Sequence, residues 1–113
     1  MTIASETLLS AQTHPGDSVS VTTVGDQYKG DGYYGRSDGL HTVQYTYTGF
    51  TGTIAIEATL AVTPEDSDWF TVFFENIDQD TASKITNFTG NYVWIRAKII
   101  YTDGTVNAIT LNH

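Results

Sequence analysis

The sequence predicts an all-β domain, a single antiparallel β-sandwich that is jelly-roll-like and has about eight strands. Three observations lead to this prediction. Residues 92–101 alternate between two faces, and a period of two indicates a strand rather than a helix. Turn residues recur at spacings near ten residues, which is typical of sandwiches and barrels. Threonine is the commonest residue and tyrosine is abundant, and both suit strands. An immunoglobulin-like sandwich is the alternative.

The N-terminal third is less regular than the rest. Residues 2–10 are expected to form a strand or an extended arm, and residues 17–24 alternate as a strand does. Residues 27–38 are rich in glycine and are expected to form a loop, with room for a short strand in it. We therefore divide the chain into a less regular strand or arm region at 1–34 and a β-sandwich body at 35–113, in one domain overall.

The body contains alternating runs separated by turn signals. Further strands are expected at residues 40–48, 53–62, 69–75 and 82–88. Residues 49–52 are interpreted as a hairpin connection and residues 76–81 as a polar loop. Asp103 and Gly104 suit a type I′ turn, which needs two residues that tolerate positive φ. The C-terminal part is therefore expected to be a long β-hairpin.

The inward faces of these runs define the expected core. Its members are Val43, Tyr45, Ile54, Ile56, Leu60, Phe70, Val72, Val93, Ile95 and Ile99. Trp69 and Trp94 lie within apolar strands and are also expected inside. A chain of 113 residues buries roughly two thirds of the surface of its unfolded form, enough for a core without covalent links. The absence of cysteine excludes disulfides and thiolate metal sites.

The charge narrows the range of partners. Thirteen acidic residues against five basic ones give a net charge of −8. This charge opposes contact with phosphate backbones and with anionic membranes, so neither nucleic acid nor a membrane is an expected partner. No apolar run approaches the roughly 20 residues of a membrane span. The N-terminus lacks the basic and apolar segments of a signal peptide.

No catalytic pattern stands out. His14, His41 and His113 do not lie in any recognised catalytic spacing, and we expect them at the surface or at strand edges. A small hydrolase that uses a carboxylate pair is the least supported hypothesis, because no pair is distinguished by its spacing. The sequence therefore predicts a protein that is not an enzyme and that holds no cofactor.

One acidic segment has the beginning of a calcium-loop pattern. Asn76, Asp78 and Asp80 alternate as oxygen ligands would, but the glycine and the terminal glutamate that complete such a loop are missing. We expect a solvated acidic loop without metal.

An aromatic segment is the candidate for a protein contact. Tyr28, Tyr33 and Tyr34 lie beside Arg36, a combination favoured at interface hot spots. The same rings could stack on sugars, and plain packing within the loop is the third possibility. The glycines around them would let the loop fit a partner.

Four blocks of the chain resemble a known family. They are residues 35–45, residues 50–54, residues 58–61 with 68–70, and residues 87–98. In order and spacing they resemble small virion structural proteins of tailed bacteriophages, notably those of marine and cyanobacterial hosts. The resemblance covers about residues 35–113 and no part of the first 34. It implies a β-sandwich with a structural role in the virion, and it supplies no catalytic residues.

Two hypotheses about function follow, one for a structural protein and one for a binding module. The first is a non-enzymatic virion protein that decorates or cements the capsid, is assembled in the host cytoplasm, works as a homo-oligomer and contacts a major capsid or tail protein. The second is a tail or fibre module that recognises host surface glycan. The acidic balance would keep an abundant protein soluble before assembly, which favours the first hypothesis.

Overall fold

The computed structural model describes residues 6–17, 19–35 and 39–112, and almost all regular structure there is β-strand. The elements are β1 (Glu6–Leu9), β2 (Gln12–Thr13), β3 (Val21–Val24), β4 (Tyr28–Lys29), α1 (Asp31–Tyr34), β5 (Leu40–Thr59), the 3-10 turn η1 (Asp66–Asp68), β6 (Phe70–Thr89) and β7 (Trp94–Asn112). The described part contains no helix that is long and apolar enough to cross a membrane.

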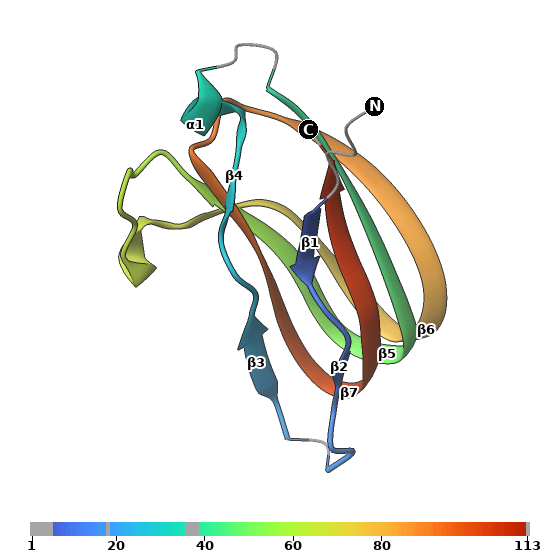
Figure 1. The fold of residues 1–113 in the computed structure, drawn as a ribbon. Coiled ribbons are helices and arrows are strands. Elements are labelled where there is room, and N and C mark those ends of the chain that lie inside the picture. The colour runs from blue at the N-terminus through green and yellow to red at the C-terminus, as the bar shows by residue number, and fades with distance from the viewer. Residues whose placement is uncertain (1–5, 18, 36–38, 113) are drawn as a thin grey trace.

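All seven strands belong to one antiparallel sheet. The central strand β5 pairs with β6 on one side and with β7 on the other. The opposite edge of β7 is covered in turn by the short strands β1, β2, β3 and β4, so residues 6–29 run along its length. The N-terminal region is thus part of the same sheet as the body (Figure 1).

The three long strands bend midway, and the sheet folds back on itself (Figure 1). Layer A consists of residues 40–48, 81–89 and 105–112 with β1 and β2. Layer B consists of residues 52–59, 70–77 and 94–101 with β3 and β4. The two layers enclose the core between their inner faces. The predicted antiparallel β-sandwich is confirmed, and it is built from one folded sheet.

The two hairpin turns and the polar loop predicted in the body are bends within strands, so the two predicted hairpins are wrong. Residues 49–52 lie inside β5, residues 76–81 inside β6, and Asp103 and Gly104 inside β7. The bends lie side by side, because Gly52 of β5 pairs with both β6 and β7. The residues that favour hairpins also allow a strand to bend sharply. Because β5 pairs with both halves of β6 and of β7, those halves cannot pair with each other.

Hydrogen bonds from backbone N–H groups to threonine hydroxyls hold the bend together. The register of the sheet shifts here, so several ladder bonds are lost. The Thr51 hydroxyl accepts from the backbone N–H of Gln79 at 3.1 Å, and the Thr81 hydroxyl accepts from that of Gly49 at 2.8 Å. Gln79 has a φ of +46°. Side chains thus replace part of the missing ladder.

Gly104 allows a close approach of two backbones within the bend. Its φ is +92°, and a Cβ at this position would lie 2.3 Å from the carbonyl oxygen of Gly49. Phe50 is fully buried at this level and stacks on Tyr101, with ring centroids 5.5 Å apart. The bend therefore depends on a missing side chain in β7 and on a large ring in β5.

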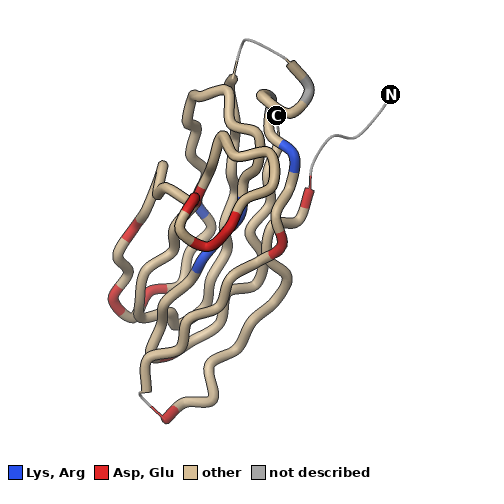
Figure 2. The backbone as a smooth tube through the Cα atoms, turned by 90° about the vertical axis from the view of Figure 1, so that its left-hand side faces the viewer, with Lys and Arg blue, Asp and Glu red and all other residues tan. Residues whose placement is uncertain are grey.

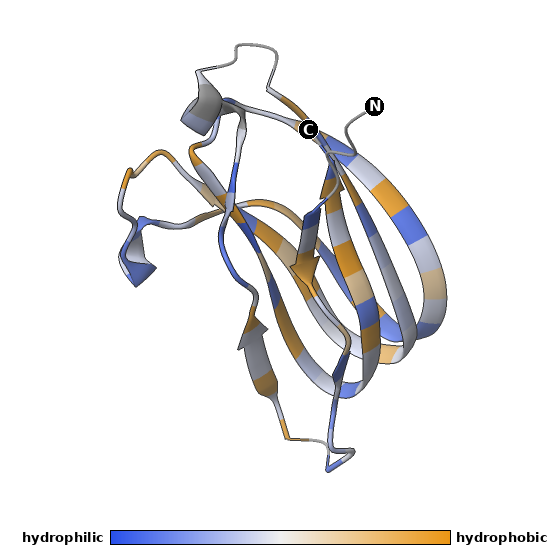
Figure 3. Cartoon of the chain, viewed as in Figure 1, coloured by the Kyte–Doolittle hydropathy of each residue, from blue (hydrophilic) through white to orange (hydrophobic). Residues whose placement is uncertain are grey.

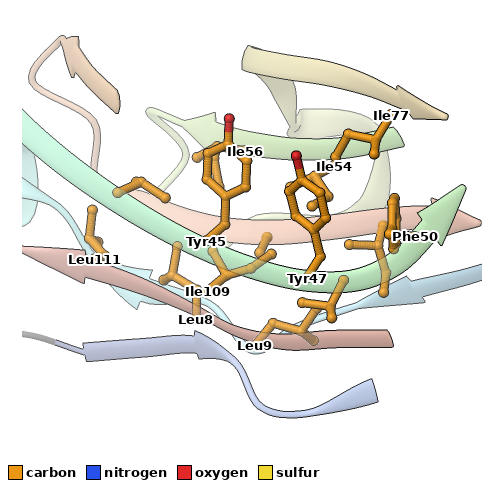
Figure 4. Close-up of a cluster of buried hydrophobic side chains, with 14 of the residues drawn as sticks. Leu8, Leu9, Tyr45, Tyr47, Phe50, Ile54, Ile56, Ile77, Ile109 and Leu111 are labelled. Atoms are coloured by element: carbon orange, nitrogen blue, oxygen red, sulfur yellow. The ribbon is translucent and has the colours of Figure 1, made fainter. Parts of the chain in front are cut away.

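The core lies between the two layers (Figure 4). Its fully buried large side chains include Tyr47, Phe50, Leu8, Ile54, Ile56, Ile95, Ile99, Ile109, Leu111, Val43 and Val106. Six of the predicted core residues are buried, namely Val43, Tyr45, Ile54, Ile56, Ile95 and Ile99. Val72 and Val93 are half-buried, and Val72 packs against the core.

Leu60 and Phe70 were predicted in the core, and this is wrong. Leu60 is 69% exposed because it follows the last residue of β5. Phe70 is 71% exposed because it is the first residue of the edge strand β6. Alternation continued to both positions in the sequence, but the second layer covers neither of them.

Two histidines are buried, so their expected place at the surface is also wrong. His14 accepts a hydrogen bond at Nδ1 from Gly16 N–H at 2.9 Å, and its Nε2 lies 2.6 Å from the carbonyl oxygen of Val19. His41 is fully buried and stacks on Phe88. The His14 ring therefore orders the local backbone, and the His41 ring is part of the core packing. His113 lies outside the described residues.

An ion pair links the two layers at the β6 edge. Lys84 of layer A bonds Glu75 of layer B at 2.8 Å, and the Tyr45 hydroxyl donates to the same carboxylate at 3.0 Å. Burial and the bond to Glu75 raise the pKa of Tyr45 to about 12. The bond to Glu75 also raises the pKa of Lys84. We call these three residues the edge clamp.

The first prediction concerns the bend. Gly104→Ala should destabilise the fold more than Gly16→Ala, although both glycines have similar positive φ angles of +92° and +83°. A Cβ at Gly16 would meet nothing within 4 Å, so that variant should cost only about 1 kcal/mol for the left-handed backbone. Gly104→Ala should cost roughly 1–3 kcal/mol more, because the backbone of Gly49 must move. Urea unfolding measures both, and equal losses would contradict the close approach.

The second prediction concerns pH and the edge clamp. Tyr45 and Lys84 both have raised pKa values in the folded state, so their contribution to stability is complete below about pH 10 and is lost as pH rises toward 12. Tyr45→Phe should lower stability by about 1 kcal/mol at neutral pH. It should also make the alkaline loss less steep. Urea unfolding from pH 8 to 12 would contradict this if the variant and the wild-type protein lost stability in parallel.

Candidate functional site

The outer face of layer B is the candidate site. Residues of β5 that alternate with the core side chains point outward here, and each pairs with a residue on β6 and one on β7. Ala55 lies at the centre, between Phe74 and Lys98. One step along, Thr53 lies between Asn76 and Ile100. One step the other way, Glu57 lies between Thr71 and Arg96.

An open groove of about 430 Å³ runs over this face. Its lining residues are Thr53, Ala55, Glu57, Thr71, Val72, Phe73, Phe74, Lys98 and Ile100. The floor is low because the small side chain of Ala55 lies between the larger Phe74 and Lys98. The register shift between Ile56 and Glu57 places Val72 as an extra residue in β6, which is the arrangement of a β-bulge. The volume falls in the range of small-ligand sites.

Basic residues gather on this face of an acidic domain. Lys29 pairs with Trp94 on the outer side, and Arg96 and Lys98 follow along β7. Figure 2 looks onto this side and shows basic positions near the middle of the molecule, with acidic positions on the loop before β6 and around the outline. Lys98 makes no hydrogen bond or ion pair within the part of the chain that the structure describes. Its ammonium group is therefore available to a ligand.

A fixed charge pair forms one end of the groove. The Arg96 Nε donates to the Glu57 carboxylate at 2.8 Å, and both side chains are largely buried. The guanidinium lies over the Trp69 ring at 4.2 Å from its centroid. Burial and the stacked ring restrict both side chains, so this pair is a rigid, mostly neutralised wall.

Aromatic residues extend the face beyond the groove. Tyr33 is 45% exposed, its ring centroid lies 5.2 Å from that of Trp94, and the Lys29 ammonium lies 4.5 Å from the centre of the Tyr33 ring. The indole N–H of Trp94 donates to the Val62 carbonyl oxygen at 2.9 Å. These contacts anchor α1 and the loop before β6 to the sheet.

Trp69 and Trp94 lie on this outer face and are half-buried, so their predicted place in the core is wrong. Trp94 has the same strand parity as Arg96, whereas the core side chains of β7 are at the alternate positions. The loop before β6 and Tyr33 cover part of the two rings. The size and hydrophobicity of the two tryptophan side chains did not show whether they are buried in the core or only partly covered on the outer face.

The residues predicted to contact a protein partner are only partly brought together. Tyr28 pairs with Ile95 and packs against the core, so it is half-buried rather than free for a partner. Tyr33 lies exposed beside the candidate face. Arg36 and the side chain of Tyr34 lie outside the described residues.

Two of the three predicted metal candidates are engaged in local hydrogen bonds. Asn76 accepts from the Thr53 hydroxyl at 2.7 Å, and Asp80 accepts from the backbone N–H of Thr81 at 2.9 Å. Among the described residues, no group of three or more histidine, aspartate or glutamate side chains is arranged to hold a metal ion. The expectation that Asn76, Asp78 and Asp80 bind no calcium remains a prediction.

A second open groove of about 440 Å³ lies at the end of layer B, between the loop before β6 and Tyr92. Leu60 and Phe70 line it and are both mostly exposed. Val62, two residues further along the loop, is 77% exposed. We call Leu60, Val62 and Phe70 the apolar rim. The first part of this loop is hydrophobic and the 3-10 turn that follows is hydrophilic (Figure 3).

Sequence analysis did not identify Ala55, Phe74 or Lys98 as members of one site. Alternation placed Lys98 on the same face as Arg96. The missing information was the pairing of β5 with both neighbours, which brings three distant segments into one row. The alternation along each strand shows which residues share a face. It does not show which residues of neighbouring strands pair with one another.

Comparison with known proteins shows the fold alone. No protein-family model and no curated protein matches the sequence. A solved structure of PirA is 14% identical, with a TM-score of 0.53 over 99% of this chain and 94% of that chain. The K3 adhesin domain of Lys-gingipain from Porphyromonas gingivalis is 7% identical, with a TM-score of 0.53 over 80% of this chain and 62% of that chain.

A chain from the structure of infectious bursal disease virus is also similar. It is 12% identical, with a TM-score of 0.50 over 95% of this chain and 30% of the viral chain. This protein therefore spans less than two thirds of the adhesin domain and less than a third of the viral chain. These likenesses support the same β-sandwich architecture. They carry no argument about function, which is argued below from the geometry of the surface.

The third prediction concerns the charge pair at the groove. Arg96→Leu should destabilise the protein by about 1–3 kcal/mol, because the buried Glu57 carboxylate would lose its partner. Glu57→Gln should likewise be destabilising, and the double variant should recover part of the summed loss. Urea unfolding of the four proteins gives the coupling energy. Strictly additive losses would show that the pair is not coupled.

Proposed function

We propose that this protein is a non-enzymatic structural component of a phage virion, of the type that decorates or cements the capsid. The observation that carries this proposal is the apolar rim of Leu60, Val62 and Phe70. Each of these side chains is more than two-thirds exposed, and two of them line one groove. Exposed apolar side chains that gather at one place are typical of protein interfaces.

The apolar rim supports a protein partner rather than catalysis. The described histidines, His14 and His41, are buried in structural contacts. The rim is flanked by Asp68 of the 3-10 turn, which would surround an apolar contact with a polar border. We propose that the partner is another particle protein, such as the major capsid or a tail protein, and that the chain resides in the virion. A homo-oligomer remains part of this proposal.

Particles of the phage that encodes the chain provide the test. Wild-type protein should be found in purified particles by mass spectrometry and should sediment saturably with particles that lack it. Leu60→Asp/Phe70→Asp should bind at least about tenfold more weakly, since it removes two apolar anchors. The control is Ile85→Asp, which changes a residue that is 68% exposed on layer A. Absence from particles, or equal binding by the rim variant, would contradict the proposal.

A second candidate function is recognition of host surface glycan by a tail or fibre module. The groove on the outer face of layer B favours it, because Phe74 is 61% exposed there and presents an open ring. The Tyr33 and Trp94 rings extend the aromatic surface next to it. This groove shares only Val72 with the groove at the apolar rim, and none of the three rim residues lines it, so the two functions are compatible in one protein.

A further inference from the structure

The groove on the outer face of layer B has two chemically different sides. Ala55 forms its low centre, the Phe74 ring stands on one side, and Lys98 stands on the other. Adjacent strands lie about 4.8 Å apart, so the backbones that carry Phe74 and Lys98 are separated by about 10 Å. A single small ring system can therefore contact both sides at once.

We infer that this groove binds a sugar unit that carries a carboxylate, of the hexuronic acid class. The inference rests on glycan recognition, the second of the proposed functions, and names its ligand. The apolar face of the sugar ring lies against Phe74 and the floor at Ala55. The carboxylate of the sugar pairs with the Lys98 ammonium.

The apolar lining fits one face of a sugar ring. Phe74 and Ile100 are 61% and 40% exposed and form the apolar sides of the groove. Hydroxyl groups stand at its ends, on Thr71 and on Thr53, whose hydroxyl donates to Asn76 and can still accept from a ligand. A pyranose has an apolar C–H face and hydroxyls around its edge, so its polar groups reach these ends while the ring covers the floor. Such sites are mostly apolar with a few placed polar groups.

The charge of Lys98 selects an anionic ligand. Arg96 is already bonded to Glu57, whereas Lys98 has no partner in the described part of the chain. A lysine in a mainly apolar groove pairs well with one carboxylate. The net charge of −8 on the whole chain opposes ligands with many negative charges. A short glycan with few carboxylates is therefore favoured over long polyanions.

An acidic peptide fits the groove less well. The backbone groups of β5 are paired on both sides by β6 and β7, so the floor offers no main-chain partner. A peptide laid across it would leave its own N–H and C=O groups without hydrogen bonds, which is costly. A fatty acid also fits poorly, because the open groove would leave most of the acyl chain in water.

Isothermal titration calorimetry of the whole chain tests the inference with two probes, a trimer of galacturonic acid and the neutral trimer of galactose. The acidic trimer should bind at least about tenfold more tightly than the neutral one, as one charge-assisted hydrogen bond implies. Lys98→Gln should lose this preference, and Phe74→Ala should weaken the binding of both trimers. Lys84→Gln removes the same charge from layer A, away from this face, and should leave the preference intact.

The outcomes separate this inference from the functions that it builds on. Equal binding of the two trimers would overturn the carboxylate assignment and leave glycan recognition standing. Binding of neither trimer at millimolar concentration, or binding that Lys98→Gln does not change, would overturn the inference. Tighter binding of an acidic peptide such as tetraglutamate would also overturn it, in favour of a protein ligand. None of these results depends on whether the chain is found in virions.

Discussion

The fold-over of three long strands at one level is the constraint on which the rest of the structure depends. β5, β6 and β7 pair over most of their length, so a bend in one strand requires a bend in its neighbour at the same level. Gly104 meets the backbone of Gly49 there, and Phe50 fills the inside of the bend. Because the bend sets how the two layers face each other, it also sets which side chains enter the core.

The candidate binding surfaces follow from the same constraint. Folding one sheet in two leaves an outer face on layer B that no other element among the described residues covers completely. The parity that directs Ile54 and Ile56 inward also directs Ala55 and Glu57 outward. The groove at Ala55 is therefore a consequence of core formation combined with the choice of one small residue. The edge clamp joins the two layers on the side where β6 has no further strand in the described part of the chain.

The sequence predicted the fold class and about a third of the buried core, because period-two alternation reports directly on the two faces of a strand. It did not show that each long strand continues through a bend and does not end at a hairpin. Gly49, Gly52 and Gly104 have the same local chemistry in a hairpin as in a bend, and only the pairing of β5 with β6 and β7 distinguishes the two. Leu60 and Phe70 show the same limit, since alternation says which face a residue occupies but not where the opposite layer ends. Lys98 and Phe74 come together through register, which single-strand patterns do not contain.

The pairing of β7 in solution is the most direct test of the folded-sheet account. In the structure, Lys98 pairs with Ala55 and Ala108 pairs with Thr46, so the two halves of β7 contact β5 at different places. Nuclear Overhauser effects between backbone protons should therefore link Lys98 to Ala55 and Ala108 to Thr46. A C-terminal hairpin that turns at Asp103 and Gly104 would instead link Ile99 to Ala108. Observation of that contact, with loss of the two contacts to β5, would contradict the account.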